Sequence, residues 1–145
     1  MPISTICPDA SLIVALVTSE SVSERALARW TEWVSAGARL VAPGLLRYEV
    51  TSALRRKVVR GLMSEPDARR ALGEALDLGI ELFDPPGMSV SAFDLAGRFG
   101  LPTTYDAHYL ALADEMAAEF WTADERLYNT VRGKFPAARC VGKEQ

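Results

Sequence analysis

Short apolar runs alternate with longer stretches of helical periodicity along the chain. The short runs are mainly apolar, as in strands buried on both faces of a parallel sheet. We expect five such strands, over residues 3–7, 39–42, 80–83, 119–122 and 138–141. Helices are expected between them, over residues 11–17, 21–35, 45–60, 64–78, 89–99, 106–117 and 124–131.

Residues with known end preferences mark the boundaries of these helices. Gly61 and Gly100 follow periodic segments, where glycine adopts the left-handed backbone that ends a helix. Ser64 precedes a proline, Pro66, in a first turn, which is typical of a helix start. The links between strands are too long for hairpins and suit helical crossovers. The pattern therefore predicts an α/β fold, a three-layer α/β/α sandwich with a central, mostly parallel five-stranded sheet.

Composition fits one globular domain and excludes several classes of function. Of the 145 residues, 49% are hydrophobic and 24% are charged, which excludes a disordered or collagen-like chain. We expect one domain over residues 1–141 and a frayed tail over residues 142–145. The net charge of −3 excludes a histone-like polycation. The sole histidine, His108, excludes chemistry by paired imidazoles within one chain, and Cys7 and Cys140 form no CxxC zinc motif.

No segment predicts export or membrane insertion. Residues 1–5 lack the basic and apolar regions of a signal peptide. The apolar run over residues 12–17 is far shorter than the roughly 20 residues that a spanning helix needs. Both cysteines lie in predicted strands, as expected for buried thiols in a reducing compartment. We therefore expect a cytoplasmic protein without a membrane partner.

Four acids stand at strand ends or interrupt apolar helix faces. Asp9 and Asp124 follow predicted strands, at the carboxyl edge where parallel sheets usually place their sites. Glu49 lies within the apolar stripe of its helix. Asp106 lies on the same face as Leu110, one turn before it. The four side chains are therefore expected to converge.

A structural role fits each acid when it is taken alone. Aspartate is a common N-cap, which suits Asp9, Asp106 and Asp124, and Glu49 suits an ion pair with an arginine such as Arg47. Together the acids repel, by about 4 kcal/mol for a pair at about 4 Å and a dielectric near 20, so protons or cations must neutralise them. Oxygen ligands alone select Mg²⁺ or Mn²⁺, and such an ion in an acidic cavity favours phosphodiester cleavage.

The segments around these acids resemble the four motifs of PIN-domain nucleases, in particular the VapC toxins of VapBC toxin–antitoxin systems. The segments read DAS at 9–11, EVTSAL at 49–54, YDAHYLALA at 105–113 and TADERL at 122–127. The last two are the most specific, and the resemblance spans nearly the whole chain. It implies a magnesium-dependent endoribonuclease, usually a homodimer, that a cognate VapB-like antitoxin holds inactive.

The resemblance also implies roles for individual residues. The catalytic acids that it implies are Asp9, Glu49, Asp106 and Asp124. The three aspartates are expected to ligate Mg²⁺, for which Mn²⁺ is a possible substitute. Ser11 and Thr122 match positions whose side chains lie near the metal or the substrate. Pro8 departs from the family pattern, in which an aliphatic residue usually precedes the first aspartate, and proline removes a backbone donor there.

Cations gather on the helix that carries Glu49. They are Arg47, Arg55, Arg56, Lys57 and Arg60, with Arg69 and Arg70 following on the next helix. We expect Arg47, Arg55 and Arg56 to contact either RNA phosphates or an acidic antitoxin segment. A solvated helix face has the same composition and remains an alternative.

Other functions are weighed against the nuclease. Phosphatases of the haloacid-dehalogenase class need Asp-x-Asp, but position 11 is Ser11. Receiver domains need an acidic pair before the acceptor aspartate and a lysine after the last strand, a pattern that this chain lacks. A catalytically weak PIN-like module that binds RNA or a partner stays open, as does a DNA-cutting relative.

Overall fold

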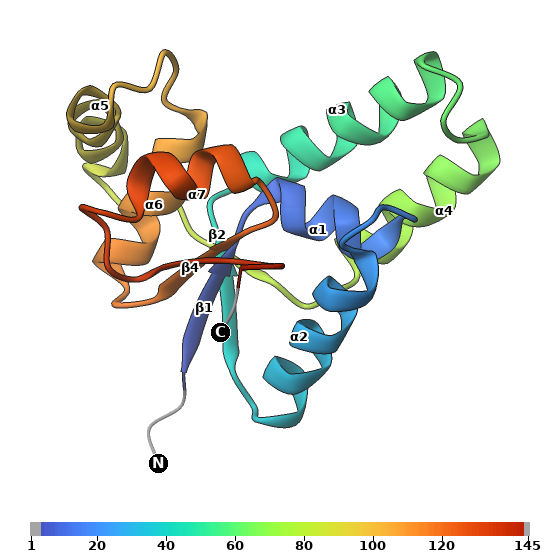
Figure 1. Ribbon diagram of the computed structural model, residues 1–145, viewed down its shortest axis with the longest axis horizontal. Coiled ribbons are helices and arrows are strands. Elements are labelled where there is room, and N and C mark those ends of the chain that lie inside the picture. Colours follow the sequence, from blue (N-terminus) through green and yellow to red (C-terminus); the bar gives the residue numbers. More distant parts are fainter. Residues whose placement is uncertain (1–3, 144–145) are drawn as a thin grey trace.

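The computed structural model describes residues 4–143 and shows a five-stranded sheet between two layers of helices (Figure 1). The strands are β1 (Thr5–Pro8), β2 (Arg39–Ala42), β3 (Glu81–Leu82), β4 (Glu119–Thr122) and β5 (Ala138–Cys140). Their order across the sheet is β3-β2-β1-β4-β5, and every recorded pairing is parallel. The predicted α/β/α sandwich is confirmed.

Seven helices link the strands within the described residues. They are α1 (Ala10–Val17), α2 (Ser23–Ser35), α3 (Leu45–Val59), α4 (Glu65–Leu76), α5 (Met88–Phe99), α6 (Tyr105–Glu115) and α7 (Glu125–Val131). Figure 1 shows α1 to α4 on one side of the sheet and α5 to α7 on the other. The outer parts of α3 and α4 extend from the body as a helical hairpin.

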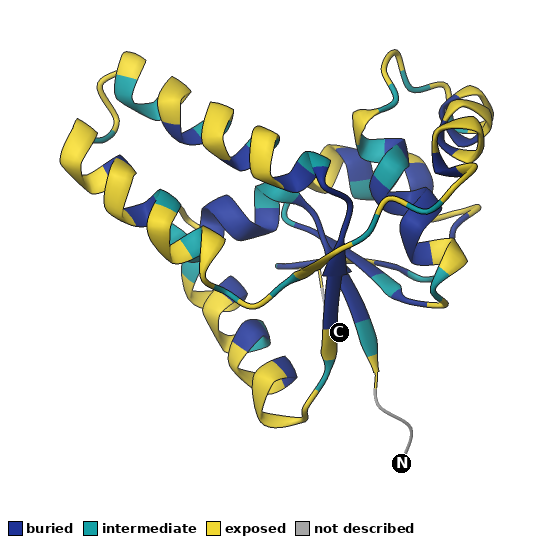
Figure 2. Ribbon diagram, turned by 180° about the vertical axis from the view of Figure 1, so that it is seen from behind, coloured by how far each residue is buried: buried dark blue, intermediate teal, exposed yellow. Residues whose placement is uncertain are grey.

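The central strands form the best-buried part of the molecule (Figure 2). Ile6, Val41 and Phe120 expose 2% of their surface or less. The mainly apolar character of their strands matches burial on both faces of the sheet. Each such side chain contributes about 1.5–3 kcal/mol to folding. This packing fixes the ends of β1 and β4, and therefore the acids that follow them.

The strand order changes direction at β1. From β1 the chain adds β2 and β3 on one side, and it then returns to add β4 and β5 on the other. The carboxyl ends of β1 and β4 therefore adjoin while their following loops diverge. A switch point of this kind is where open parallel sheets usually bind ligands.

Some element boundaries differ from the prediction. The third strand spans only Glu81–Leu82 rather than residues 80–83, because it lies at the sheet edge and pairs with β2 alone. The helix expected to end at Leu78 ends at Leu76, with Asp77 as its C-cap. Gly100 closes α5 with a φ of 67°, as its position predicted. Ile3, expected to begin the first strand, lies outside the described residues.

The predicted tail over residues 142–145 is described only as far as Lys143. The Lys143 ammonium lies 2.9 Å from the Glu125 carboxylate, which connects this end of the chain to α7. Residues 144 and 145 lie outside the described part, and the division at residue 141 stays a prediction. Between residues 4 and 143, no helix combines the length and apolar character needed to cross a bilayer.

Candidate active site

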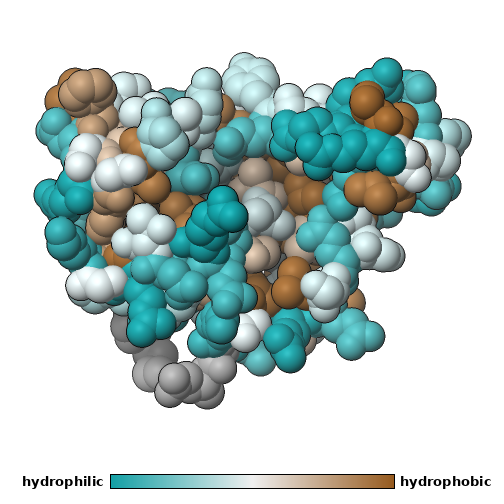
Figure 3. Space-filling model, turned by 45° about the horizontal axis from the view of Figure 1, so that its top comes forward, coloured by the Kyte–Doolittle hydropathy of each residue, from teal (hydrophilic) through white to brown (hydrophobic). Residues whose placement is uncertain are grey.

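The four predicted acids line one cavity at the carboxyl ends of β1 and β4. Its volume is about 380 Å³, and Figure 3 shows the surface hollowed between the helical hairpin and the rest of the body. The acidic residues in its wall are Asp9, Glu49, Asp106, Asp124 and Glu20. The four predicted acids come from four separate segments of the sequence and are brought together here, as the sequence pattern predicted, and Glu20 joins them.

Asp9 is the most deeply buried of these acids, with 3% of its surface exposed. Its backbone N–H donates to the carbonyl of Trp121 at 2.9 Å, which ties it to β4. Its Oδ1 accepts from the Ser11 hydroxyl at 2.6 Å and from the Leu12 N–H at 3.1 Å. The bond from Leu12 makes Asp9 the N-cap of α1, so the aspartate caps a helix and lines the cavity at once.

The pKa of Asp9 is raised to about 7, mainly by burial. Hydrogen bonds from the Ser11 and Thr122 hydroxyls and from the Leu12 N–H lower it, and repulsion from Asp106 raises it further. A buried acid with this shift favours a neutralising proton or cation. Strongly shifted acids in a cavity are also typical of functional sites.

Two hydroxyls connect the loops that leave β1 and β4. Ser11 Oγ lies 3.1 Å from Thr122 Oγ1 and accepts from the Ala123 N–H at 3.0 Å. Thr122 Oγ1 accepts from the Asp124 N–H at 2.9 Å. Asp124 Oδ1 accepts from the Leu127 N–H at 3.1 Å and caps α7. The two hydroxyls thus position the loops that carry acids, which gives them a structural role at the places the sequence predicted.

Asp106 lies in the first turn of α6 and does not cap it. Thr104 holds the N-cap position, so the interpretation of Asp106 as an N-cap is wrong. Its half-buried carboxylate faces the cavity instead. Burial, followed by repulsion from Glu49 and Asp124, raises the pKa of Asp106 to about 6. Asp106 is therefore exposed to repulsion from both Glu49 and Asp124.

Glu49 reaches the cavity from α3, and its partner is a tyrosine. The hydroxyl of the fully buried Tyr109 donates to Glu49 Oε1 at 2.6 Å. Burial and the nearby Glu49 charge raise the pKa of Tyr109, so the phenol remains a donor. The expected ion pair with Arg47 is not recorded among residues 4–143, and the Arg47 guanidinium lies over the Tyr48 ring, 5.7 Å from its centroid. No local pattern in the sequence connects Tyr109 with Glu49, because their bond depends on how α3 and α6 are placed.

Cations from the later turns of α3 form another wall of the cavity. They are Arg56, Lys57 and Arg60. The Lys57 ammonium pairs with Glu20 at 2.8 Å. In the described part of the chain, no ion pair is recorded for Arg56 or Arg60. Of the three arginines proposed from the sequence as contacts, only Arg56 lies in this wall.

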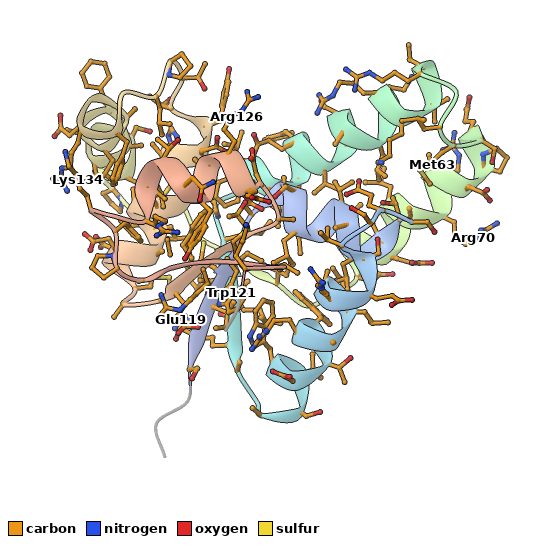
Figure 4. The ribbon with its side chains drawn as sticks, in the orientation of Figure 1. Met63, Arg70, Glu119, Trp121, Arg126 and Lys134 are labelled. Atoms are coloured by element: carbon orange, nitrogen blue, oxygen red, sulfur yellow. The ribbon has the colours of Figure 1, made fainter. Side chains whose placement is uncertain are left out.

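The remaining cations of the helical hairpin lie elsewhere. Arg55 is exposed and lies 3.7 Å from Glu65. Arg47 lines a separate cavity of about 470 Å³ between α3, α5 and α6. Arg70 lies far out on the hairpin, remote from Trp121 in β4 (Figure 4). A basic stretch that looks continuous in sequence therefore divides between different surfaces.

The donor set suits a hard divalent cation, although no ready-made cage is present. No group of three or more acid, histidine or cysteine side chains in residues 4–143 is arranged to hold a metal ion. The hydrogen bonds recorded for Glu49 and Asp124 each engage only one carboxylate oxygen. Mg²⁺ commonly keeps several waters and takes one or two carboxylates directly, so it does not require a closed cage.

Comparison with known proteins identifies the family of this chain. Residues 6–133 match the family model described as the PIN domain, a range that includes all four acids. The chain belongs to the PIN-domain family. The resemblance carried by the four motifs is thereby confirmed.

Within the PIN family, the chain is similar to VapC proteins. Ribonuclease VapC3 from Pyrobaculum aerophilum is 34% identical over 131 residues, which cover 89% of this chain and 93% of that protein. The crystal structure of PAE2754 from the same organism gives a TM-score of 0.70 at 24% identity, covering 98% of this chain and 93% of the other. VapC20 from Mycobacterium tuberculosis, described as a toxin that cleaves the sarcin-ricin loop, gives 0.65 at 15% identity, covering 90% and 95%. This PIN domain is therefore of the VapC type.

Proposed function

We propose that this PIN-domain protein is the toxin of a type II toxin–antitoxin system and a Mg²⁺-dependent endoribonuclease. The observation that carries the proposal is the convergence of four carboxylates in one cavity that also has a cationic wall. Relatives that are similar over most of the chain are named VapC ribonucleases, which supports RNA as the substrate.

The four acids have different roles in the proposed reaction. Asp9, Asp106 and Asp124 would hold the ion, directly or through water, and Glu49 would orient the attacking water or hold a second ion. When bound, Mg²⁺ supplies a water of lowered pKa and neutralises charge on the phosphate. The chain has a single histidine, so it lacks the paired imidazoles that could help the RNA 2′-hydroxyl attack the phosphate. Attack by water is therefore favoured.

Metal removal tests the proposed reaction. The chain treated with EDTA should cleave RNA at least about 100-fold more slowly than with Mg²⁺, and Mn²⁺ should restore cleavage, because the four acids need a cation to accept the phosphate. A labelled RNA resolved on a denaturing gel measures the rate. Undiminished cleavage in EDTA would sink the proposal.

The same assay separates the alternatives. Single-stranded DNA of matching sequence, run in parallel, identifies a DNA-cutting enzyme if it is the better substrate. RNA that is bound but stays intact with Mg²⁺ identifies a binding module. Preference for RNA together with cleavage supports the proposed endoribonuclease.

The cationic wall is proposed to hold RNA phosphates beside the acids. Reversing two charges, with Arg56→Glu and Arg60→Glu, should weaken RNA binding about tenfold or more and reduce the slope of log affinity against log salt by about 1 to 2. Fluorescence anisotropy with labelled RNA in EDTA, between about 50 and 300 mM salt, measures both quantities without cleavage.

Arg55→Glu is the matched control for this charge reversal. Arg55 lies on the same helix but outside the cavity, where it pairs with Glu65. An equal loss of affinity in this control would show that overall charge, rather than the cavity wall, binds RNA. Loss of antitoxin binding with RNA binding retained would assign the wall to the antitoxin instead.

We propose a homodimer and a VapB-like antitoxin as protein partners. Tyr48, Val90 and Tyr105 are more than half exposed around the cavity between α3, α5 and α6. Val59 and Leu62 expose 74% and 66% of their surface at the turn between α3 and α4. Exposed apolar groups of this size commonly mark protein contacts. The thiols of Cys7 and Cys140 are buried and form no disulfide in the described structure, which supports a reducing cytoplasm as the compartment.

A further inference from the structure

We infer that Tyr109 is a positioning residue, whose buried hydroxyl holds Glu49 so that one carboxylate oxygen remains directed to the acidic cavity. The inference rests on the proposed nuclease function and adds to it a residue outside the four acids. Tyr109 does not line the cavity, so its action would pass through Glu49 alone.

Tyr109 is a rigid partner for this bond. Its side chain is fully buried, and its backbone carbonyl accepts from Cys7 Sγ in β1 at 3.7 Å. The O–H···O⁻ distance of 2.6 Å to Glu49 is within the range of strong, charge-assisted hydrogen bonds. A ring that cannot turn away, joined to a carboxylate by such a bond, fixes the position of that carboxylate.

Glu49 depends on this support more than the aspartates depend on theirs. Asp9 and Asp124 each accept from a backbone N–H three residues ahead, in the helix that they cap. Glu49 has a longer side chain with more rotamers, and its carboxylate accepts no backbone hydrogen bond recorded within residues 4–143. Its one recorded donor comes from α6, which lies on the other side of the sheet from α3 (Figure 1).

Repulsion inside the cavity makes the anchor necessary. Glu49 lines the same cavity as Asp9, Asp106 and Asp124, and like charges gathered in one cavity repel. Without an anchor, the half-exposed Glu49 side chain would lower this repulsion by turning to solvent. The hydroxyl prevents this by engaging Oε1 and leaving Oε2 without a recorded hydrogen bond in the described structure.

One helix thereby places two acids. Asp106 and Tyr109 are three residues apart and share a face of α6. The first turn presents the Asp106 carboxylate to the cavity, and the next presents the hydroxyl that holds the acid of α3. Asp106 therefore contributes its own carboxylate to the site, and Tyr109 contributes through its hydrogen bond to Glu49.

The substitution Tyr109→Phe tests the inference, because it removes the hydroxyl and keeps the ring. We expect kcat for RNA cleavage to fall about tenfold with KM nearly unchanged. Mn²⁺ affinity, titrated by calorimetry without RNA, should fall about tenfold as well, because Glu49 is proposed to hold a second ion or the metal-bound water and Tyr109 orients it. The control is Tyr128→Phe, which removes a partly exposed hydroxyl from α7, outside the acidic cavity, and should change neither quantity.

A double-mutant cycle distinguishes positioning from general support of the fold. In a Glu49→Gln background, Tyr109→Phe should lower kcat by less than about twofold, because the acid through which it acts is already neutralised. A loss of the same size in both backgrounds would overturn the inference, as would unchanged Mn²⁺ affinity and kcat in Tyr109→Phe.

A second variant covers the case in which Tyr109→Phe does not fold. Glu49→Asp shortens the side chain, so its carboxylate cannot reach Tyr109 and the cavity together, and it should lose activity and Mn²⁺ affinity to a similar degree. Full retention of both would overturn the inference. If the wild-type chain cleaves no RNA, the nuclease proposal fails, and the Mn²⁺ titrations still decide the role of Tyr109.

Discussion

Replacing Asp106 with asparagine should lower the rate of RNA cleavage by about 1,000-fold or more while the protein stays folded. Asp106 is the acid whose pKa is raised by the charges of both Glu49 and Asp124 as well as by burial, so it lies where a bound cation would offset the most repulsion. A neutral amide removes the anionic ligand, and a loss of about 4 kcal/mol in stabilisation of the reacting phosphate corresponds to about a thousandfold in rate.

The fold should tolerate this change. Within residues 4–143, no hydrogen bond or ion pair is recorded for the Asp106 side chain, so the amide breaks no contact. Asp114→Asn is the matched control, because Asp114 is exposed on the same helix and lies outside the acidic cavity. Single-turnover cleavage with saturating Mg²⁺ measures the effect, and circular dichroism checks folding. An Asp106→Asn protein that keeps more than about a tenth of the activity would remove Asp106 from the proposed metal site.

The fold was predictable where local pattern and tertiary packing agree. The apolar runs of β1, β2 and β4 identify strands, because burial on both faces leaves no room for polar alternation. The short β3 was overestimated, since Ile80 and Phe83 look like strand residues but only Glu81 and Leu82 find partners on β2. Its extent depends on pairing at the sheet edge, which residue preferences do not encode.

The acids of the site were predictable for a similar reason. Asp9 and Asp124 directly follow strands, and parallel strands that adjoin bring their carboxyl ends together. The bond between Tyr109 and Glu49 joins residues 60 positions apart. No local pattern connects them, and both aromatic packing and an arginine partner were simpler expectations. Only the relative placement of α3 and α6 determines this contact.

The cationic wall of Arg56, Lys57 and Arg60 was predictable in part. Glu49, Ala53, Arg56 and Arg60 recur at intervals of three or four residues and line the same cavity. This spacing places them on one face of α3, whereas Arg55 is displaced from it. Helical periodicity applied to the basic residues, and not only to the apolar ones, would have favoured Arg60 over Arg55. Which way that face points still depends on how the hairpin packs.

Replacing Asp9 with asparagine should stop metal-dependent cleavage and yet stabilise the metal-free protein. Asp9 exposes 3% of its surface, and its pKa is raised to about 7 by burial and by Asp106, so the ionised form is disfavoured in the fold. An asparagine Oδ1 can still accept from the Ser11 hydroxyl and the Leu12 N–H, and asparagine is a good N-cap. We expect a gain of about 2 kcal/mol near pH 8 in EDTA, or a rise in Tm of about 6 °C.

Thermal unfolding followed by circular dichroism, in EDTA and in Mg²⁺, measures the stability of the metal-free protein and its increase when Mg²⁺ binds. The wild-type Tm should rise with Mg²⁺, because a ligand of the native state stabilises it, and Asp9→Asn should lose most of that response. Asp124→Asn is the control: Asp124 is also an N-cap and a proposed ligand but is exposed, so this variant should lose cleavage without gaining stability.

A lower Tm for Asp9→Asn in EDTA would mean that the charge of Asp9 supports the fold. A higher Tm with cleavage abolished would mean that this protein retains a buried charge at the expense of stability, which is the relation expected of a residue kept for chemistry.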